Sequence, residues 1–319
     1  MSHRIQQSLI VPAELGEQRL DMAASELMPE YSRSRIQSWI KQGALRVNGK
    51  QVKPKEKVIE GDQIELDVEL EAQGDWEAQP IALDIVFEDE HLLVINKQAD
   101  FVVHPAAGHS DGTVVNAVLH HCPALAELPR AGIVHRLDKD TTGLMVIAKT
   151  LVAHSSLVEQ LQAREMGREY EAVVYGELTG GGMVDAAIGR HPQSRQKMAV
   201  TRGGKDAVTH YRLMRRWRGF THLRLKLETG RTHQIRVHMA HVNHAILGDP
   251  LYGGRPRLPK GLASETIEYL RSFGRQALHA KALELSHPTT GEVLSWEVDL
   301  PEDMKGLLNR LDMEEEDAA

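Results

Sequence analysis

Hydrophobic and polar positions along the chain follow two periods, and these predict its secondary structure. Runs in which apolar residues are continuous, or alternate with polar ones, predict strands at 92–96, 171–177, 207–213, 221–228 and 282–285. Apolar residues at helical spacing predict helices at 113–121, 151–164, 233–244 and 264–272. Because several neighbouring strands have connections of hairpin length, we expect an α+β domain with a mixed, largely antiparallel sheet.

A smaller α/β module is expected ahead of this domain, over residues 16–68. Its predicted elements are a helix opening at Arg19, a helix at 33–41, a tight turn at Asn48-Gly49 and a strand at 62–68. The polar residues 1–15 that precede the module are expected to be loosely held.

Polar segments set the remaining boundaries. Residues 69–80 are acidic and lack a sustained period, which is typical of a linker that lets the small domain move relative to the large one. We expect the large domain over 81–312. The acidic residues 313–319 are expected to be disordered.

Composition narrows the class of protein. The 319 residues suffice for one large and one small domain, and a hydrophobic content of 41% is typical of a globular protein. The single cysteine, Cys122, excludes a disulfide within the chain and fits a cytoplasmic location. Neither a signal-peptide pattern nor an apolar run near about 18 residues is present, so we expect no membrane segment.

The distribution of charge predicts a polyanionic partner, although the net charge is −7. Residues 30–57 hold eight basic and two acidic side chains, and residues 190–236 hold thirteen and two. Either patch alone would fit a solvated face. Two basic patches on an acidic chain fit nucleic acid better.

The candidate chemistry lies in residues 132–149. There Asp138 and Asp140 fall on a short loop between two apolar runs, 133–134 and 144–148, that we expect to be strands. A loop held by two strands is where a rigid scaffold places reactive side chains. From these residues alone, a salt-bridged solvated connector is an equally good interpretation.

A resemblance decides between the two interpretations. His135-Arg136-Leu137-Asp138, followed by Lys-Asp-Thr-Thr-Gly-Leu, resembles the signature of the RluA family of RNA pseudouridine synthases. Residues 168–176, 229–238 and 276–280 match three further family motifs in order, and the amino-terminal module resembles an S4 RNA-binding domain. The resemblance runs from about residue 16 to about residue 308. Two positions, Gln98 and Ala106, depart from the family pattern and concern loop shape only.

The resemblance implies that the protein detaches uracil from ribose, rotates it and rejoins it through carbon. Asp138 matches the essential aspartate. It could attack the sugar, attack the base or remove the ribose C2′ proton. No cofactor is implied, and the chain has no Walker loop, no Gly-x-Gly-x-x-Gly and no cysteine pair for zinc.

Three further site residues follow from the motifs. Tyr170 matches the family's active-site tyrosine and would stack on uracil, with an ordinary core tyrosine as the alternative. Arg231, preferred over Arg236, would pair with Asp138 and keep it ionised. Arg136 would fill the space left by a flipped base, or else form a structural pair with Asp138 or Asp140.

The S4-like module implies a surface that grips RNA phosphates. Arg33, Arg35, Lys41 and Arg46 are expected on one helix–hairpin face of it. A plain protein-docking module is the alternative. His238, His241 and His244 form a row on a predicted helix, but no carboxylate or cysteine completes a metal site at ligand spacing, so no metal is expected.

The resemblance also implies partners. We expect isomerisation of specific uridines in large-subunit ribosomal RNA, in the stem-loop at the subunit interface, with the free RNA or the assembling large subunit as partner. No protein partner is implied, and a monomer is expected. The rival hypotheses are a non-catalytic RNA-binding assembly factor and an aspartate-dependent N-glycosidase that would release free uracil.

Overall fold

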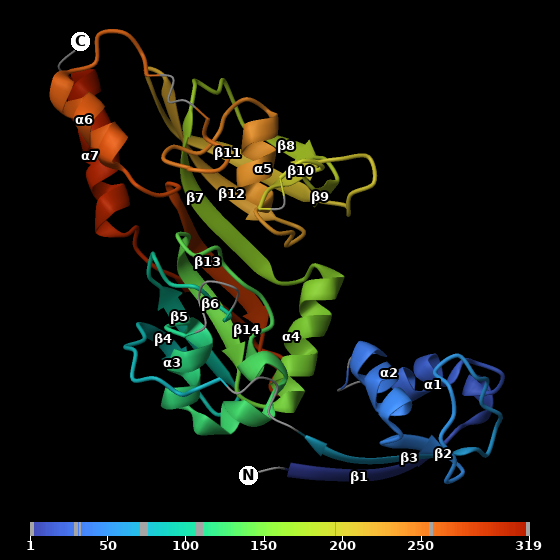
Figure 1. The fold of residues 1–319 in the computed structure, drawn as a ribbon. Coiled ribbons are helices and arrows are strands. Elements are labelled where there is room, and N and C mark those ends of the chain that lie inside the picture. Colours follow the sequence, from blue (N-terminus) through green and yellow to red (C-terminus); the bar gives the residue numbers. More distant parts are fainter. Residues whose placement is uncertain are drawn as a thin grey trace.

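The computed structural model describes residues 3–28, 31, 33–70, 76–105, 111–194, 196–254 and 258–316. Ala106 lies outside these residues. Two units, each with a hydrophobic core of its own, follow one another along the chain (Figure 1).

The small unit is a three-stranded antiparallel sheet with the strand order β1-β3-β2, covered by two helices. Its elements are β1 (His3–Ile10), a 3-10 turn at Ala13–Leu15, α1 (Leu20–Leu27), α2 (Arg33–Gln42), β2 (Leu45–Val47) and β3 (Gln63–Leu70). Leu20, Ile36 and Leu45 are among the side chains that close the core. The prediction that residues 1–15 are loosely held was wrong for 3–10, because β1 pairs with β3 along its whole length.

The predicted tight turn at Asn48-Gly49 is confirmed. Both residues have positive φ, 50° and 72°, and Val47 and Lys50 exchange two backbone hydrogen bonds of 2.9 Å across them. Such a turn needs left-handed backbone at both central positions, which asparagine and glycine tolerate best.

The carboxyl-terminal end of the predicted linker packs on the large unit. The Asn116 side chain donates to the Glu77 carbonyl at 2.7 Å, and the Gln79 amide donates to the Asn116 carbonyl at 3.0 Å. Trp76 packs against the large core. The linker prediction was therefore wrong for residues 76–80, and also for 69–70, which belong to β3, while 71–75 lie outside the described residues.

The large unit is built on a mixed sheet, as the sequence predicts. Its strand order is β4-β5-β6-β13-β7-β12-β11-β8, with β14 paired to β13. The strands are β4 (Ile85–Glu88), β5 (Leu92–Lys97), β6 (Thr142–Ala148), β7 (Gly167–Tyr175), β8 (Gly182–Asp185), β11 (Val208–Trp217), β12 (Phe220–Leu227), β13 (Leu278–Ser286) and β14 (Val293–Glu297). Every pairing in this sheet is antiparallel except the short parallel contact between β6 and β13. A separate pair, β9 (Ile188–Arg190) and β10 (Met198–Val200), lies beside it.

Helices cover the sheet and its ends (Figure 1). They are α3 (Val114–His121), α4 (Leu151–Ala163), α5 (Gln234–His241), α6 (Ser264–Ser272) and α7 (Glu302–Glu316), with 3-10 turns at Pro123–Glu127 and Pro129–Gly132. None of the helices in the described part of the chain is long and apolar enough to cross a membrane.

The acidic tail was predicted to be disordered from residue 313, and this was wrong for 313–316. Helix α7 continues to Glu316, because Leu307 and Leu311 are buried on one face and anchor the helix. The Glu314 carboxylate accepts hydrogen bonds from the Ala263 amide, at 2.9 Å, and from the Thr266 hydroxyl.

Candidate active site

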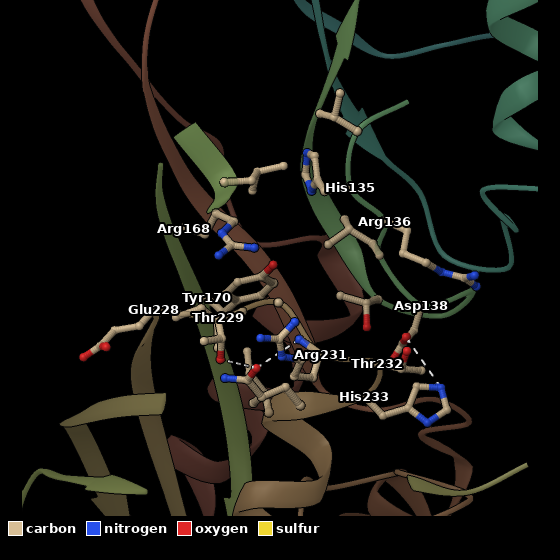
Figure 2. A pocket seen from close by; sticks show the side chains of 18 of the residues that line it. His135, Arg136, Asp138, Arg168, Tyr170, Glu228, Thr229, Arg231, Thr232 and His233 are labelled. Carbon is tan, nitrogen blue, oxygen red and sulfur yellow. Dashed lines mark hydrogen bonds and ion pairs between the residues drawn. The ribbon is translucent and has the colours of Figure 1, made fainter. Parts of the chain in front are cut away.

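A cleft of about 570 Å³ opens between the loop that leads into β6, one face of β7 and the segment that leads into α5. Figure 2 shows side chains from all three walls pointing into it. Asp138, Tyr170, Arg136 and Arg231, the four candidates from the large domain, all line this cleft. The tertiary structure thus brings together motifs that are up to 95 residues apart (Arg136 to Arg231).

The loop that carries Asp138 is held from beneath by a buried lysine. Lys97 is 1% exposed, and its Nζ donates to the carbonyls of Gln98, Phe101 and Lys139 at 2.8–2.9 Å. The Thr141 amide closes the loop by donating to the Asp138 carbonyl at 3.1 Å. Burial lowers the pKa of Lys97 to about 7, against the pull of Asp140 and Asp138.

The predicted strand at 133–134 is only an isolated bridge between Ile133 and Ile147. The chain reaches it through three successive left-handed residues, Arg130, Ala131 and Gly132. Gly132 is required there, because a Cβ would lie 2.0 Å from the Ala148 carbonyl oxygen. This turn directs residues 133–138 along the wall of the cleft.

Arg236, and not Arg231, pairs with Asp138. Its Nη1 lies 2.9 Å from Asp138 Oδ2, while Nε and Nη2 donate to the buried Asp249 at 2.7 and 2.9 Å. Arg231 instead donates from Nε to the Asp206 carbonyl at 3.0 Å.

Local structure explains this correction. Helix α5 begins only at Gln234, whose side-chain oxygen accepts from the Arg231 amide at 3.0 Å and holds Arg231 in the preceding turn. Arg236 lies in the first turn of α5, on its buried face, 4% exposed. The sequence held one hint that Arg236 is the paired arginine, because the carboxylate Asp249 follows it 13 residues later. The sequence did not show that the fold places Asp249 against Arg236.

His233 is a site residue that the sequence reading missed. It has a left-handed backbone, with φ 56°, and its Nε2 lies 3.7 Å from Asp138 Oδ1. Its Nδ1 lies 2.8 Å from the Tyr252 hydroxyl, and the oxygen of that hydroxyl accepts a hydrogen bond from the Met198 amide. Burial lowers the pKa of His233, although the neighbouring Asp138 opposes that shift.

Tyr170 and Arg168 project from the same face of β7. Tyr170 is 7% exposed, and burial raises its pKa, so that the phenol is neutral at neutral pH. A neutral ring on a cleft wall can stack on a base, and the predicted stacking role stays a prediction. Burial also lowers the pKa of His135 to about 3, and its Nε2 accepts from the Val146 amide at 3.1 Å.

Arg136 is exposed at the cleft, and no ion pair joins it to Asp138 or Asp140. The alternative of a structural pair with either aspartate was therefore wrong. The guanidinium is available to an incoming group, as a base-replacing role requires.

In the small unit the four basic candidates are less alike than expected. Arg33 donates to the buried Asp21 at 3.0 and 3.2 Å, which ties α2 to α1. Arg35 lies over the Trp39 ring at 5.2 Å. Lys41 and Arg46 are exposed, and Arg46 donates to the Gly43 carbonyl at 2.9 Å. The common RNA-binding face stays a prediction, and Lys41 and Arg46 fit it best.

The histidine row has other partners. His238 is bonded to the Thr209 hydroxyl and the Ala186 carbonyl, both at 2.9 Å, and His244 Nδ1 to the Tyr175 carbonyl at 2.9 Å. Among the described residues, no group of three metal-ligating side chains is gathered.

Comparison with known proteins identifies the class of enzyme to which this chain belongs. The family model described as RNA pseudouridylate synthase matches residues 91–241, and the S4 domain model matches residues 18–64. The chain belongs to the RNA pseudouridine synthase family and is an RNA pseudouridine synthase.

Individual relatives show which members of this family the chain resembles. The chain is 58% identical over 316 residues to ribosomal large subunit pseudouridine synthase D of Pseudomonas aeruginosa, with 99% of both chains covered. It is 56% identical over 318 residues to the protein of that name from Escherichia coli K12, covering 99% of this chain and 98% of the relative. The solved structure of human RNA pseudouridylate synthase domain containing 4 is 27% identical, with a TM-score of 0.57, over 72% of this chain and 92% of that one.

Proposed function

We propose that this protein converts specific uridines of large-subunit ribosomal RNA to pseudouridine, with Asp138 as the carboxylate that acts beside the target ribose. The names of the two bacterial relatives support the substrate, because the similarity extends over nearly the whole chain. The observation that carries the catalytic assignment is the placement of Asp138. Its side chain is 20% exposed and is bonded to Arg236 at 2.9 Å. It lines the same cleft as Tyr170 (Figure 2).

The remaining residues serve recognition in this proposal. Tyr170 stacks on the flipped uracil, and Arg136 fills the space that the base leaves in the RNA. Lys41 and Arg46 of the small unit grip phosphates away from the cleft. The target is the stem-loop at the subunit interface, met in free RNA or in the assembling large subunit.

A non-catalytic assembly factor is the second candidate, because the same basic surfaces would bind RNA. Such a factor has no need for a cleft carboxylate held by an arginine that is itself anchored on the buried Asp249. This arrangement favours the enzyme.

The deciding experiment maps pseudouridine in large-subunit RNA transcribed in vitro, after incubation with the wild type, Asp138→Asn or Asp140→Asn and without added cofactor. Asp140 is the matched control, because it lies on the same loop but outside the cleft lining. We expect carbodiimide-dependent reverse-transcription stops with the wild type and Asp140→Asn, and none with Asp138→Asn.

Two other outcomes contradict the proposal. RNA binding by all three proteins, with no pseudouridine in either free RNA or assembled subunits, would favour the assembly factor. Release of free uracil would indicate an N-glycosidase.

A further inference from the structure

Arg168 is a buried cation that forms no ion pair with any residue that the structure describes. It is 6% exposed, and its Nε has no hydrogen-bond partner among the described residues. Two further arginines are buried in the described part of the chain, Arg236 and Arg275, and both bond carboxylates. A buried charge without a partner is costly, and native proteins retain one where it serves a purpose.

The neighbours of Arg168 cannot neutralise it. Its positive charge acts on His135 and Tyr170, yet both are neutral, because burial lowers the pKa of His135 to about 3 and raises that of Tyr170. A guanidinium has five N–H donors and no acceptor, so it binds electron-rich oxygens, and only a group that carries negative charge can offset its own charge. Arg168 lines the cleft, which gives such a group access.

Gly230 makes room for the guanidinium. A Cβ at this position would lie 2.6 Å from Nη1 of Arg168. The backbone of Gly230 is not in the left-handed region, so alanine would be tolerated there except for this contact. Glycine at position 230 of the motif therefore leaves space for the guanidinium of Arg168.

We propose that Arg168 is a catalytic residue that binds a carbonyl oxygen of the target uracil and stabilises the negative charge of the base while it is detached. The inference rests on the proposed function, in which uracil stacks on Tyr170. Side chains two residues apart on a strand lie about 6.6 Å from one another on the same face. A pyrimidine stacked on Tyr170 therefore brings one of its carbonyl oxygens toward Arg168, as the two side chains lie in Figure 2.

The charge that Arg168 meets follows from the reaction. When the bond between N1 and C1′ breaks, its electron pair leaves with uracil, and the negative charge is shared with the two carbonyl oxygens. The pair that then joins C5 to C1′ comes from the ring. C5 afterwards loses its proton and N1 gains one, so that no atom is lost from the RNA. A fixed cation beside a carbonyl oxygen lowers the energy of the detached anion.

A backbone phosphate is a poorer ligand for Arg168. Phosphates remain at the surface of RNA, whereas Arg168 is buried within the cleft. The exposed Arg130 and Arg136 line the same cleft and suit phosphates better. A flipped base is the part of the substrate that enters deeply.

The test uses the full chain with large-subunit RNA, in single-turnover reactions at saturating protein and in parallel RNA-binding measurements. The variants are Arg168→Gln, which removes the charge, Arg168→Lys, which retains it, and Gly230→Ala, which displaces it. Arg271→Gln, an exposed arginine on α6, is the matched control.

We expect Arg168→Gln to lower the single-turnover rate constant by about 100-fold or more while RNA affinity changes little. Gly230→Ala should lower it in the same direction, Arg168→Lys should recover part of the rate, and Arg271→Gln should match the wild type. Replacing the target uridine by 2-thiouridine or 4-thiouridine weakens one carbonyl acceptor. One of these substitutions should slow the wild type and have no further effect on Arg168→Gln.

Two other outcomes would contradict the proposed role of Arg168, and they differ from each other in what is measured. Weaker RNA binding with a shallower salt dependence and an unchanged rate at saturation would make Arg168 a phosphate ligand and overturn the proposal. A merely structural arginine would lower the thermal unfolding midpoint when changed to glutamine, whereas removal of an unpaired buried charge should leave it unchanged or raise it. Wild-type activity on this RNA tests the proposed function separately, because the inference is decided by the ratio of variant to wild-type rates.

Discussion

Asp138 is linked to the interior by a chain of charges. Arg236 bonds Asp138 on one side and Asp249 on the other, and the Asp249 side chain, 0% exposed, also accepts from the amides of Leu251 and Tyr252. Burial alone would raise the pKa of Asp249, but the hydrogen bonds and charge of Arg236 hold it below its usual value. Arg236 therefore has a fixed position before RNA binds, and so does the carboxylate it orients.

The first prediction at the residue scale separates the two arginines. Arg236→Met leaves Asp249 buried without its cation, so the free energy of unfolding should fall by about 3–5 kcal/mol. Pseudouridine formation should also be lost. Arg231→Met removes one partly exposed hydrogen bond and should lower the free energy of unfolding by less than about 1 kcal/mol. Urea denaturation of both variants measures the difference.

A double variant serves as the control for stability. Adding Asp249→Asn to Arg236→Met removes the uncompensated charge and should restore part of the lost stability without restoring activity. If Arg231→Met lowers the free energy of unfolding more than Arg236→Met does, Arg236 does not stabilise the fold through its bonds to Asp138 and Asp249.

The second prediction concerns Lys97, whose pKa of about 7 lies below the ordinary lysine value of 10.5. Between these values the unfolded chain binds more protons than the folded one, so the contribution of Lys97 to the free energy of unfolding rises with pH. From pH 7 to pH 9 the rise should be about 2 kcal/mol. Urea denaturation of the wild type and Lys97→Met at both pH values isolates this contribution. Parallel pH dependences in the two proteins would contradict it.

At the scale of elements, the junction between β6 and β13 joins the two halves of the large sheet. It is parallel and consists of the pairs Thr142–His279 and Gly143–Ala280. Gly143 has φ 111°, and a Cβ there would lie 2.2 Å from the Ala280 carbonyl oxygen. The strand that follows the Asp138 loop thus approaches β13 more closely than a side chain permits.

The prediction at this scale is that Gly143→Ala separates the two strands. Backbone strain and a clash with main-chain atoms should lower the free energy of unfolding by more than about 2 kcal/mol, with a loss of activity. Gly180 is the control, because it has open space around it and no left-handed backbone. Gly180→Ala should change the free energy by less than about 0.5 kcal/mol in the same denaturation series.

For the whole molecule, the proposed function assigns chemistry to the large unit and RNA affinity to the small unit. The large unit holds the cleft, and the small unit presents exposed cations on a core of its own. Affinity that comes from phosphate contacts falls as salt rises, whereas chemistry at saturation does not depend on those contacts.

Neutralising Lys41 and Arg46 together, as Lys41→Gln/Arg46→Gln, should therefore weaken RNA binding and make its salt dependence shallower. The slope of log affinity against log salt should fall by about 1–2, which corresponds to two phosphates. The single-turnover rate at saturation should stay unchanged. Lys305→Gln, a single neutralisation of an ion-paired lysine on α7, is the control and should leave the slope as it is. Binding at several salt concentrations decides between these outcomes and the protein-docking alternative, in which the slope would not move.

Local patterns were sufficient to predict most elements of the fold and much of the site. The helix at 264–272 and the strand at 92–96 were predicted to within a residue, because apolar periodicity is a property of neighbouring positions. The placement of Asp138 and Tyr170 in one cleft also followed, through motif resemblance. Residues 3–10 and 313–316 were misjudged because their order comes from partners far along the chain, β3 for the first and the packing of α7 on the large unit for the second.

The sequence by itself determined the class of enzyme, the two-unit order and the residues near the chemistry, because each depends on short motifs and local period. Only the tertiary structure decided that Arg236 holds Asp138, that His233 lies beside Asp138, and that Arg168 is buried without an ion pair in the described part of the chain. These facts depend on distances between residues such as 138, 236 and 249. The order of residues does not show whether Arg231 or Arg236 faces the interior. That depends on where α5 begins and on the carboxylate, Asp249, that the fold places next to the helix.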